Sequence, residues 1–305
     1  MVKIIPYSPA YLASYQDLAK RSWWGKNCYQ QTEKYLDWLY TANPYKNTEC
    51  PFLLVIEPQS NAVVGVIHKM RLPWLIDGQK VIVSAIHNLF VEEKYRQGCG
   101  LMLITASLKG ETNVLCPGVL PPLSEAYRML RFQEIDALRF RKFILPLGSK
   151  KIRAQKITNP SDTQISDMIR TLNNKSGNHI LWDTEIFKWR FLQGPKHIFL
   201  WEDEQNFLIL FRGKRKGLNI VRIIDGNIDN PDSTLWTDML NCARSLGAVC
   251  LLGYCADSSL KKYFLSKIKP RRKTPLVFFY HRDKQAKEMN FNASAGDSGF
   301  EGLNS

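Results

Sequence analysis

A strand that runs directly into a glycine-containing turn and a helix start is the feature that most restricts this fold. Residues 86–91 are an apolar stretch of strand character, Gly98 and Gly100 follow shortly after, and an apolar helix start comes next. The N–H groups of such a turn and of the first helical turn point at one place and bind an anion such as phosphate. The glycines allow close approach because they carry no Cβ. A plain strand-to-helix connection that happens to contain two glycines remains the alternative.

Length and composition indicate a globular chain with a full-sized core. The 305 residues suffice for one large domain or two ordinary ones, and 45% hydrophobic and 11% aromatic residues are typical of globular proteins. No apolar run approaches the roughly 18 residues of a membrane span. Residues 1–6 lack the apolar segment and cleavage site of a signal peptide. We therefore expect a cytoplasmic protein without a membrane span.

The cysteines and histidines argue against a disulfide framework or a metal centre. The seven cysteines are an odd number, they are scattered from Cys28 to Cys255, and no two form a Cys-x-x-Cys pair. The five histidines are dispersed as well. We therefore predict no bound metal.

The formal net charge of +14 favours anionic partners. Nucleic acid, an anionic membrane and phosphorylated small molecules all suit such a charge. Many basic residues lie in two segments, Arg212–Lys216 and Lys261–Lys273. Each segment can also be a solvated face or a hairpin turn. The sequence contains no recognisable helix-turn-helix, zinc finger or RNA-recognition motif, so nucleic acid is the less favoured partner.

Apolar periodicity predicts a mixture of helices and strands in the first half. Helices are expected at residues 8–23, 32–40 and 124–130, and strands at 51–57, 62–70, 80–91 and 113–120. A helix of about ten residues is expected after the glycine turn. Alternation along the strand 80–91 is expected to place these side chains on one face: Val81, Val83, Ala85, His87, Leu89 and Val91.

The second half of the chain repeats a pattern of the first. The segment Trp38–Pro44 has a counterpart of the same spacing in Trp189–Pro195, and in both places a helix precedes an apolar hairpin. Such self-similarity indicates two copies of one αβ unit. The second copy lacks the glycine turn and carries Asp225 and Asp229 there, which would repel a phosphate. The predicted division is a first domain at 1–148, a second at 149–283 and a polar, disordered tail at 284–305.

Three stretches of the first half follow one family pattern. They are Leu89-Phe90-Val91-x-x-x-Tyr95-Arg96-x-Gly98-x-Gly100, Tyr127-Arg128-Met129-Leu130-Arg131-Phe132 and Val64-Gly65-Val66-Ile67. At these residues the chain resembles the GCN5-related N-acetyltransferases, the GNAT superfamily. That family has Arg/Gln-x-x-Gly-x-Gly/Ala after a strand and often Tyr-x-x-x-Gly-Phe on its last helix. Here the turn is one residue shorter, and Arg131 stands where the family usually has glycine.

The resemblance implies a mixed α/β (α+β) fold of tandem GNAT-like domains, each a mostly antiparallel central sheet flanked by helices. In its length and two-domain organisation the chain resembles the tandem GNAT proteins of bacterial polysaccharide biosynthesis. The implied co-substrate is acetyl-CoA or another acyl-CoA. Its pyrophosphate would lie in the turn, and its pantetheine arm would pair with backbone where strands splay after Val91. The residues implied to bind CoA are Phe90, Val91, Arg96, Gln97, Gly98, Cys99, Gly100 and Leu101.

The implied chemistry is direct attack of an amine on a thioester, which needs a base and an acid. Tyr127, by its place in the family pattern, is the expected acid, and a core tyrosine is the alternative. His87 is the expected base because its unperturbed pKa of about 6.5 suits the role, and a core histidine is the alternative. Glu92 is the second choice of base, or else a solvated charge. Cys99 is interpreted as a small packing residue, since this chemistry needs no acyl-enzyme.

Three functions are compatible with these patterns. The preferred one is acyl-CoA-dependent N-acyltransfer, with acetyl as the expected group, to a small amine acceptor such as an amino sugar or a nucleotide-linked amino sugar. The second is a catalytically silent GNAT scaffold that binds nucleic acid through its basic excess. The third is a transferase acting on aminoacyl-tRNA. Fold alone does not decide among them.

Overall fold

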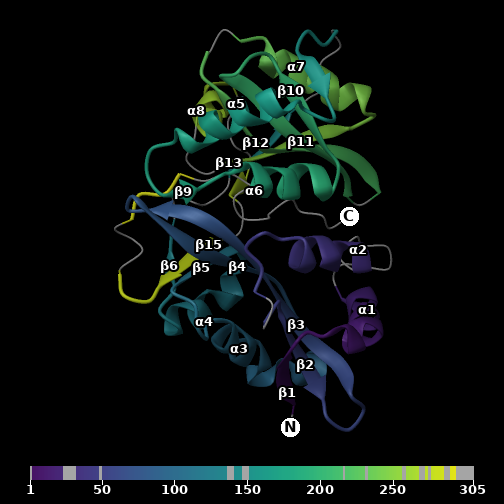
Figure 1. The fold of residues 1–305 in the computed structure, drawn as a ribbon. Helices are drawn as coiled ribbons and strands as arrows, with labels where there is room; N and C mark the ends of the chain where they lie inside the picture. Colours follow the sequence, from purple (N-terminus) through teal and green to yellow (C-terminus); the bar gives the residue numbers. More distant parts are fainter. Residues whose placement is uncertain are drawn as a thin grey trace.

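Two β-sheets form the framework of the molecule (Figure 1). The computed structural model describes residues 2–22, 32–47, 50–135, 141–145, 151–215, 217–230, 233–255, 259–267, 272–273, 276–284 and 289–292. Sheet A has the order β1 (Lys3–Pro6), β2 (Leu53–Glu57), β3 (Ala62–Ile76), β4 (Gln79–Val91), β5 (Asn113–Val119), β15 (Leu276–His281) and β6 (Gln133–Glu134), and β9 (His179–Ile180) also pairs with β3. Sheet B has the order β14 (Arg272–Lys273), β7 (Arg141–Leu145), β13 (Cys250–Cys255), β12 (Leu218–Ile228), β11 (Asn206–Arg215), β10 (His197–Trp201) and β8 (Gln155–Ile157).

Helices cover both faces of each sheet. Sheet A carries α1 (Leu12–Arg21) and α2 (Glu33–Leu36) on one face and α3 (Arg96–Ser107) and α4 (Ser124–Met129) on the other. Sheet B carries α5 (Asp162–Asn173) and α6 (Thr184–Lys188) on one face and α7 (Leu235–Ser245) and α8 (Ser259–Lys267) on the other. The pairs β4–β5 and β12–β13 are parallel, and the other ladders of the described strands are antiparallel. The predicted mixed, mostly antiparallel architecture is confirmed.

Short turns set the register of the long hairpin that crosses sheet A. Asp77 and Gly78 both have positive φ values, 50° and 77°. Two successive residues with positive φ match the right-handed twist of the strands that they join, which is why Asp-Gly is favoured there. The turn pairs Ile76 directly with Gln79. As a result β3 extends to Ile76, six residues beyond the predicted end at Met70.

One hydrophobic core joins the two sheets. The face of sheet A that carries α1 and α2 and the face of sheet B that carries α5 and α6 pack into a single cluster of buried side chains, here called the shared core. Its members include Tyr15 and Phe52 from the first half and Trp182 and Phe199 from the second. Burying side chains of this size contributes about 1.5–3 kcal/mol each, so the two sheets stabilise each other.

The sheets exchange strands across the predicted boundary at residue 148. Strand β7 precedes that boundary and pairs with β13 in sheet B. Strand β15, close to the end of the described chain, pairs with β5 and β6 in sheet A (yellow beside blue in Figure 1). Neither half of the sequence therefore contains all the strands of its own sheet.

The repeated tryptophan segment forms the contact between the two halves. In each copy an α-helix continues as a π-helical turn, Asp37–Thr41 in the first (η3) and Trp189–Gln193 in the second (η7). The indole N–H of Trp38 donates to the carbonyl of Trp189 at 2.8 Å, and that of Trp189 donates to the carbonyl of Trp38 at 2.6 Å. The two rings stack with centroids 5.4 Å apart.

Gly194→Ala is expected to lower the free energy of unfolding by about 1–3 kcal/mol. A Cβ at Gly194 would lie 2.5 Å from Cε2 of Trp38, so the stacked indole pair would have to move. Urea unfolding followed by tryptophan fluorescence measures the loss. Gly100→Ala is the control, because a Cβ there meets no atom within 4 Å. Equal unfolding midpoints for the two variants would contradict the role of the indole contact.

At the end of α4, Arg131 stands in a backbone conformation that glycine usually adopts. Arg131 has φ +66°. The N–H of Phe132 donates to the carbonyl of Tyr127 at 3.0 Å, as in a Schellman helix end. A side chain in this conformation costs about 1–2 kcal/mol, and glycine avoids most of that cost.

Arg131→Gly is therefore expected to raise the free energy of unfolding by up to about 1 kcal/mol, since the more flexible unfolded chain offsets part of the gain. Chemical denaturation measures the change. Lys109→Gly is the matched control at the end of α3, where φ is not positive, and it should destabilise. A lower midpoint for Arg131→Gly would contradict the strain at this position.

Part of the predicted disordered tail is packed, which corrects that prediction for residues 289–292. Phe291 is 1% exposed and contacts the rings of Trp74 and Phe279. The backbone of Asn290 and Asn292 bonds to Asn178 at 2.6 and 2.8 Å. The prediction failed because two apolar residues in a polar stretch suffice to anchor it. Residues 285–288 and 293–305 of that tail lie outside the described residues, as do residues 268–271 of the basic segment Lys261–Lys273.

Candidate functional site

The two parallel strands of sheet A part shortly after they meet. The β4–β5 ladder contains only the pairs Ser84–Val114 and Ala85–Leu115. Strand β4 then continues to Val91, and the far edge of β5 pairs with β15. The splay thus begins after Ala85 and not after Val91 as predicted. The backbone edge of β4 from residue 86 onward has no strand partner on this side among the described strands.

A bulge in β4 reverses which way its last residues face. Ile67 of β3 is opposed by two residues of β4, and one of them, Asn88, has φ +51°. Up to Ala85 the alternate side chains enter the shared core, whereas Leu89 and Val91 pack on the other face with α3. The prediction that all six alternate residues share one face is therefore wrong beyond His87, because the extra residue shifts the alternation.

The glycine turn interrupts the start of α3. Gln97 (ψ 100°) and Gly98 (φ 77°) depart from helical geometry, and the regular helix begins only at Cys99. A Cβ placed on Gly98 or Gly100 would meet no atom within 4 Å. The first N–H groups of a helix have no intrahelical acceptor. The turn therefore presents backbone donors beside open space, which is the geometry that binds a phosphate.

Neighbouring charged residues fix the turn to the sheet. Nε of Arg96 donates to the carbonyl of Val91 at 3.1 Å, which ties the turn to the end of β4. The hydroxyl of Tyr95 donates to the carboxylate of Glu57, and Nζ of Lys94 lies 3.6 Å from the same group. Hydrogen bonds from Ser60 and Tyr95 are the main causes that lower the pKa of Glu57. The side chains of Lys94 and Arg96 are exposed around the turn.

Tyr127 lies on α4 and points into the core between α4 and sheet A. It is 3% exposed, packs against Phe132 and Phe278, and its hydroxyl bonds to the thiol of Cys116. Burial, and then the neighbouring thiol, raise the pKa of Tyr127 well above its ordinary value, so the hydroxyl keeps its proton. Cys116 is the first residue of β5 beyond the last β4–β5 pair, which places Tyr127 beside the start of the splay.

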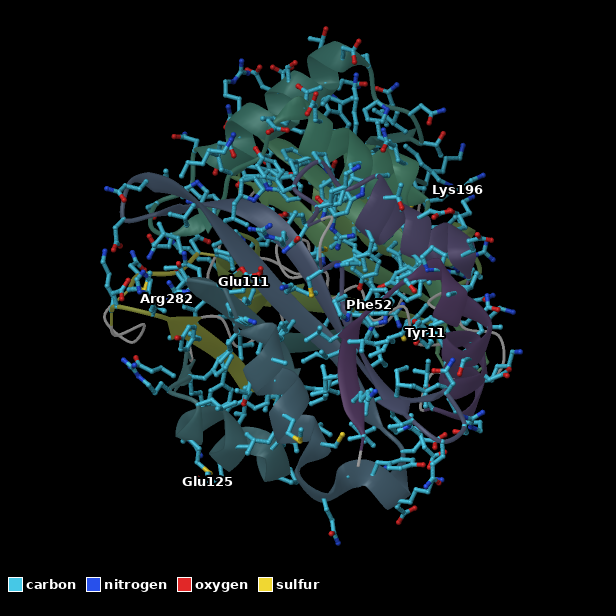
Figure 2. All side chains as sticks on the ribbon, turned by 60° about the horizontal axis from the view of Figure 1, so that its bottom comes forward. Tyr11, Phe52, Glu111, Glu125, Lys196 and Arg282 are labelled. Carbon is cyan, nitrogen blue, oxygen red and sulfur yellow. The ribbon has the colours of Figure 1, made fainter. Side chains whose placement is uncertain are left out.

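His87 lies beyond the same ladder end, on the opposite face of sheet A. It is part-buried, its ring centroid is 5.6 Å from that of His68, and its Nδ1 has no hydrogen-bond partner among the described residues. The ring of His68 in turn packs against that of Phe52, which is labelled in Figure 2, with the ring centroids 4.8 Å apart. Burial, with the positive charge of Arg190 as the second cause, lowers the pKa of His87 to about 4. The imidazole is therefore neutral at pH 7.

The remaining predicted residues occupy distinct environments. Glu92 is engaged in an ion pair, because Nη2 and Nε of Arg21 lie 2.7 and 3.1 Å from its Oε1. Cys99 is 2% exposed, and burial raises the pKa of its thiol, as suits a packing residue. Phe90 is part-buried against the shared core, Val91 is buried on the α3 face, and Leu101 is part-buried. Glu92 is thus the least suited to act as a base.

Sheet B repeats the bulge and splay but fills its helix terminus with its own carboxylate. The β12–β13 ladder ends at Ile223–Gly253, and a register shift follows on β12. At the start of α7, the N–H and hydroxyl of Thr234 donate to Oε1 of Glu202 at 3.2 and 2.9 Å, and the hydroxyl of Ser233 donates to Oε2. Glu202 therefore takes the place that a phosphate would occupy at this helix.

Arg190 is a site residue that sequence reasoning missed. It comes from η7, is 0% exposed, and lies over the rings of Trp38 and Phe191 with its Cζ 5.6 and 5.9 Å from their centroids. Its charge acts on His87, which belongs to the other sheet. Its only sequence signal is that it follows the repeated Trp189, and that position in the first copy is Leu39.

The described residues contain no group of three or more histidine, cysteine, aspartate or glutamate side chains that could hold a metal ion. No described helix is both long enough and apolar enough to cross a membrane.

Sequence comparison and fold comparison give different results for this chain. No protein-family model matches it, and a search of curated proteins finds no match. The fold is similar to that of Saccharomyces cerevisiae N-myristoyltransferase with bound myristoyl-CoA, with a TM-score of 0.65 and 11% identity over 92% of this chain and 82% of the other. At this identity the similarity shows the fold alone.

Two bacterial structures extend the comparison. A GCN5-related N-acetyltransferase from Anabaena variabilis has a TM-score of 0.58 and 12% identity, and the match covers 91% of this chain and 72% of the Anabaena chain. A GCN5-related N-acetyltransferase from Kribbella flavida has a TM-score of 0.59 and 15% identity, covering 92% and 71%. The chain therefore has the fold seen in GCN5-related acetyltransferases and N-myristoyltransferase.

Proposed function

We propose that this chain, which has the fold of N-acyltransferases, transfers an acyl group from acyl-CoA to a small amine. The observation that carries the proposal is the combination of an open glycine turn at α3 with a β4–β5 splay directly beside it. The turn supplies donors for a pyrophosphate, and the unpaired edge of β4 supplies donors and acceptors for the amide groups of pantetheine. Acetyl is the expected acyl group, and longer acyl groups are compatible with the same contacts.

The candidate acid and base stand on opposite faces of sheet A with the splay between them. A thioester in the splay would have its sulfur toward Tyr127 and its carbonyl carbon toward His87. The amine nitrogen attacks that carbon, the C–N bond forms, and the C–S bond breaks. His87 accepts the proton that the amine loses, and the hydroxyl of Tyr127 donates a proton to the thiolate. The neutral state of His87 and the protonated state of Tyr127 at pH 7 match these roles.

The two sheets would divide the work. We assign residues 1–148, completed by β15, to the acyl-CoA unit and residues 149–283, completed by β7, to a second copy that shapes the acceptor side. Occupation of the α7 terminus by Glu202 supports one acyl-CoA per chain. Arg190, delivered from the second unit to His87, supports an acceptor site between the sheets. An amino sugar or its nucleotide-linked form is the preferred acceptor class.

Incubation of the purified chain with acetyl-CoA, longer acyl-CoAs and a panel of small amines tests this function. Release of free CoA thiol together with mass-spectrometric detection of the acylated amine is the expected result. The His87→Ala variant should lower kcat by about 100-fold or more. Failure of every acyl-CoA and amine pair to give product would overturn the proposed function. Retention on DNA with salt-sensitive elution and no product would favour the nucleic-acid alternative.

A further inference from the structure

A buried carboxylate of the second sheet has an unsatisfied oxygen. Asp225 lies on β12 just past the end of the β12–β13 ladder and is 0% exposed. Its Oδ1 accepts the N–H of Gly226 at 2.8 Å and lies 3.5 Å from Nζ of Lys175. Its Oδ2 is buried and has no hydrogen-bond partner among the described residues. One oxygen of this carboxylate is therefore open to a further donor.

A comparison within the molecule shows how unusual this arrangement is. Glu111, labelled in Figure 2, is also a buried carboxylate, at 6% exposed. Its Oε1 lies 2.8 Å from Nζ of Lys69, and its Oε2 accepts the hydroxyl of Ser84 at 2.7 Å. Both of its oxygens are thus satisfied by the chain. A buried carboxylate oxygen without a donor is costly, so a missing partner at Asp225 is expected to come from outside the described residues, as a bound ligand would.

The backbone next to Asp225 is irregular. The register of β11 and β12 shifts between Ile223 and Asp225, which leaves Ile224 as the extra residue of a bulge. Gly226 has φ +143°, and a Cβ there would lie 2.4 Å from the carbonyl oxygen of Phe207, so only glycine fits this position. Bulges are over-represented next to active sites, where they re-aim a side chain.

Asp225 and His87 occupy comparable places in the two sheets. Each follows the end of a parallel ladder and lies next to a bulge. Asp225 is paired across the strands with Ile209, which packs in the shared core, and His87 lies on the face whose residues Val83 and Ala85 pack in the same core. The two side chains therefore approach the shared core from opposite sheets.

The two places differ in the amine that each can accommodate. Arg190 brings a buried positive charge to His87, so a cationic group is repelled there and an uncharged amine is favoured. Asp225 is paired with Lys175 through Oδ1 but keeps Oδ2 as an unused acceptor, so an ammonium group can donate to it. An acceptor that places an uncharged amine at His87 and a second, charged amine at Asp225 would match both.

We propose that Asp225 binds a second ammonium group of the acceptor, so that among small amines, amino sugars included, those with a second amine are preferred. This inference rests on the proposed N-acyltransfer. The second ammonium donates to Oδ2 of Asp225, and Lys175 holds Oδ1. The distance between the two amines sets which acceptor fits, so chain length is the variable that the enzyme selects.

The test uses α,ω-diamines of increasing chain length, each matched with the monoamine of equal carbon number, and acetyl-CoA as donor. The wild type should show kcat/KM about 10- to 100-fold higher for the best diamine than for its monoamine. In Asp225→Asn this advantage should disappear. Asp162→Asn, a change in an exposed carboxylate on α5, is the control and should keep the advantage. Equal kcat/KM for diamine and monoamine in the wild type, or an advantage that survives in Asp225→Asn, would overturn the inference.

Calorimetric titration with cadaverine and n-pentylamine, without acyl-CoA, separates the inference from the proposed function. Binding of cadaverine but not of n-pentylamine, without transfer to any amine, would contradict N-acyltransfer and leave the Asp225 site standing. Lys175→Met removes the internal cation and should tighten cadaverine binding severalfold, so the inference is tested even where Asp225→Asn does not fold. Unchanged or weaker cadaverine binding in Lys175→Met, or no binding by the wild type, would count against an ammonium site.

Discussion

Gly100→Asp is expected to weaken acyl-CoA binding by at least about 100-fold while the chain remains folded. The new Cβ enters open space, so folding meets no steric obstacle. The carboxylate, however, would stand at the start of α3, where the pyrophosphate is proposed to bind, and opposed like charges cost several kcal/mol, which is more than a hundredfold in affinity. Calorimetric titration with acetyl-CoA measures the loss, and circular dichroism checks the fold.

Two variants serve as controls for this prediction. Gly100→Ala adds the Cβ without the charge and should bind acetyl-CoA within about tenfold of the wild type. Thr105→Asp adds the same charge to an exposed position further along α3 and should bind as the wild type does. Wild-type affinity in Gly100→Asp would show that the glycine turn does not hold the pyrophosphate.

Arg190→Met is expected to raise the pKa of His87 from about 4 toward 6.5. The cationic guanidinium disfavours a second positive charge nearby, so its removal makes protonation of His87 easier. Transfer needs the neutral imidazole, so the acid limb that His87 contributes to the rate profile of the wild type should appear only as the pH drops toward 4. In Arg190→Met the same fall should begin at higher pH, because burial alone then holds the pKa down. The pH profile of kcat/KM and an NMR titration of His87 measure the shift.

Arg190→Lys keeps the positive charge and should leave the acid limb close to its wild-type position. Arg212→Met removes an exposed arginine of sheet B and should do the same. The NMR titration does not depend on activity, so it tests the charge effect even if the proposed reaction is wrong. An acid limb and a His87 pKa that do not move in Arg190→Met would separate Arg190 from the site.

Much of the framework could be predicted from the sequence because it depends on local patterns. Alternation of apolar residues located β2, β3, β4 and β5 of sheet A, and the Asp77-Gly78 dipeptide is typical of the hairpin turn that joins β3 and β4. Gly98, predicted to lie in a tight turn, has a positive φ, which glycine adopts without steric cost. The repeated tryptophan segment was visible as spacing, and it proved to be a contact between the two halves.

The features that were missed depend on contacts between distant residues. No local pattern shows that β15 leaves the second half to pair with β5, or that β7 joins sheet B. The bulge at Asn88 adds one residue to an otherwise regular alternation, so Leu89 and Val91 were assigned to the wrong face. Phe291 was assigned to a disordered tail because its flanking residues are polar. Each of these errors concerns where an element packs and not whether it forms.

The polar residues of the site were the hardest to predict. Arg190 and Asp225 act through burial and through neighbours from other elements, and nothing in their flanking sequence distinguishes them from solvated charges. Glu202 lies just after the hairpin strand β10, yet its partners Ser233 and Thr234 are in the connection to α7. Pairings of this kind follow from the assembled sheets, so no local sequence pattern indicates them.

A crystal structure of the chain with bound acetyl-CoA tests most directly whether the glycine turn holds the pyrophosphate. We expect one molecule per chain, with its pyrophosphate within hydrogen-bond distance of N–H groups between Gln97 and Leu101. We also expect the pantetheine arm between β4 and β5 beyond the Ala85–Leu115 pair. Acetyl-CoA bound at the start of α7, or a glycine turn that stays empty at saturating acetyl-CoA, would contradict the proposed binding site.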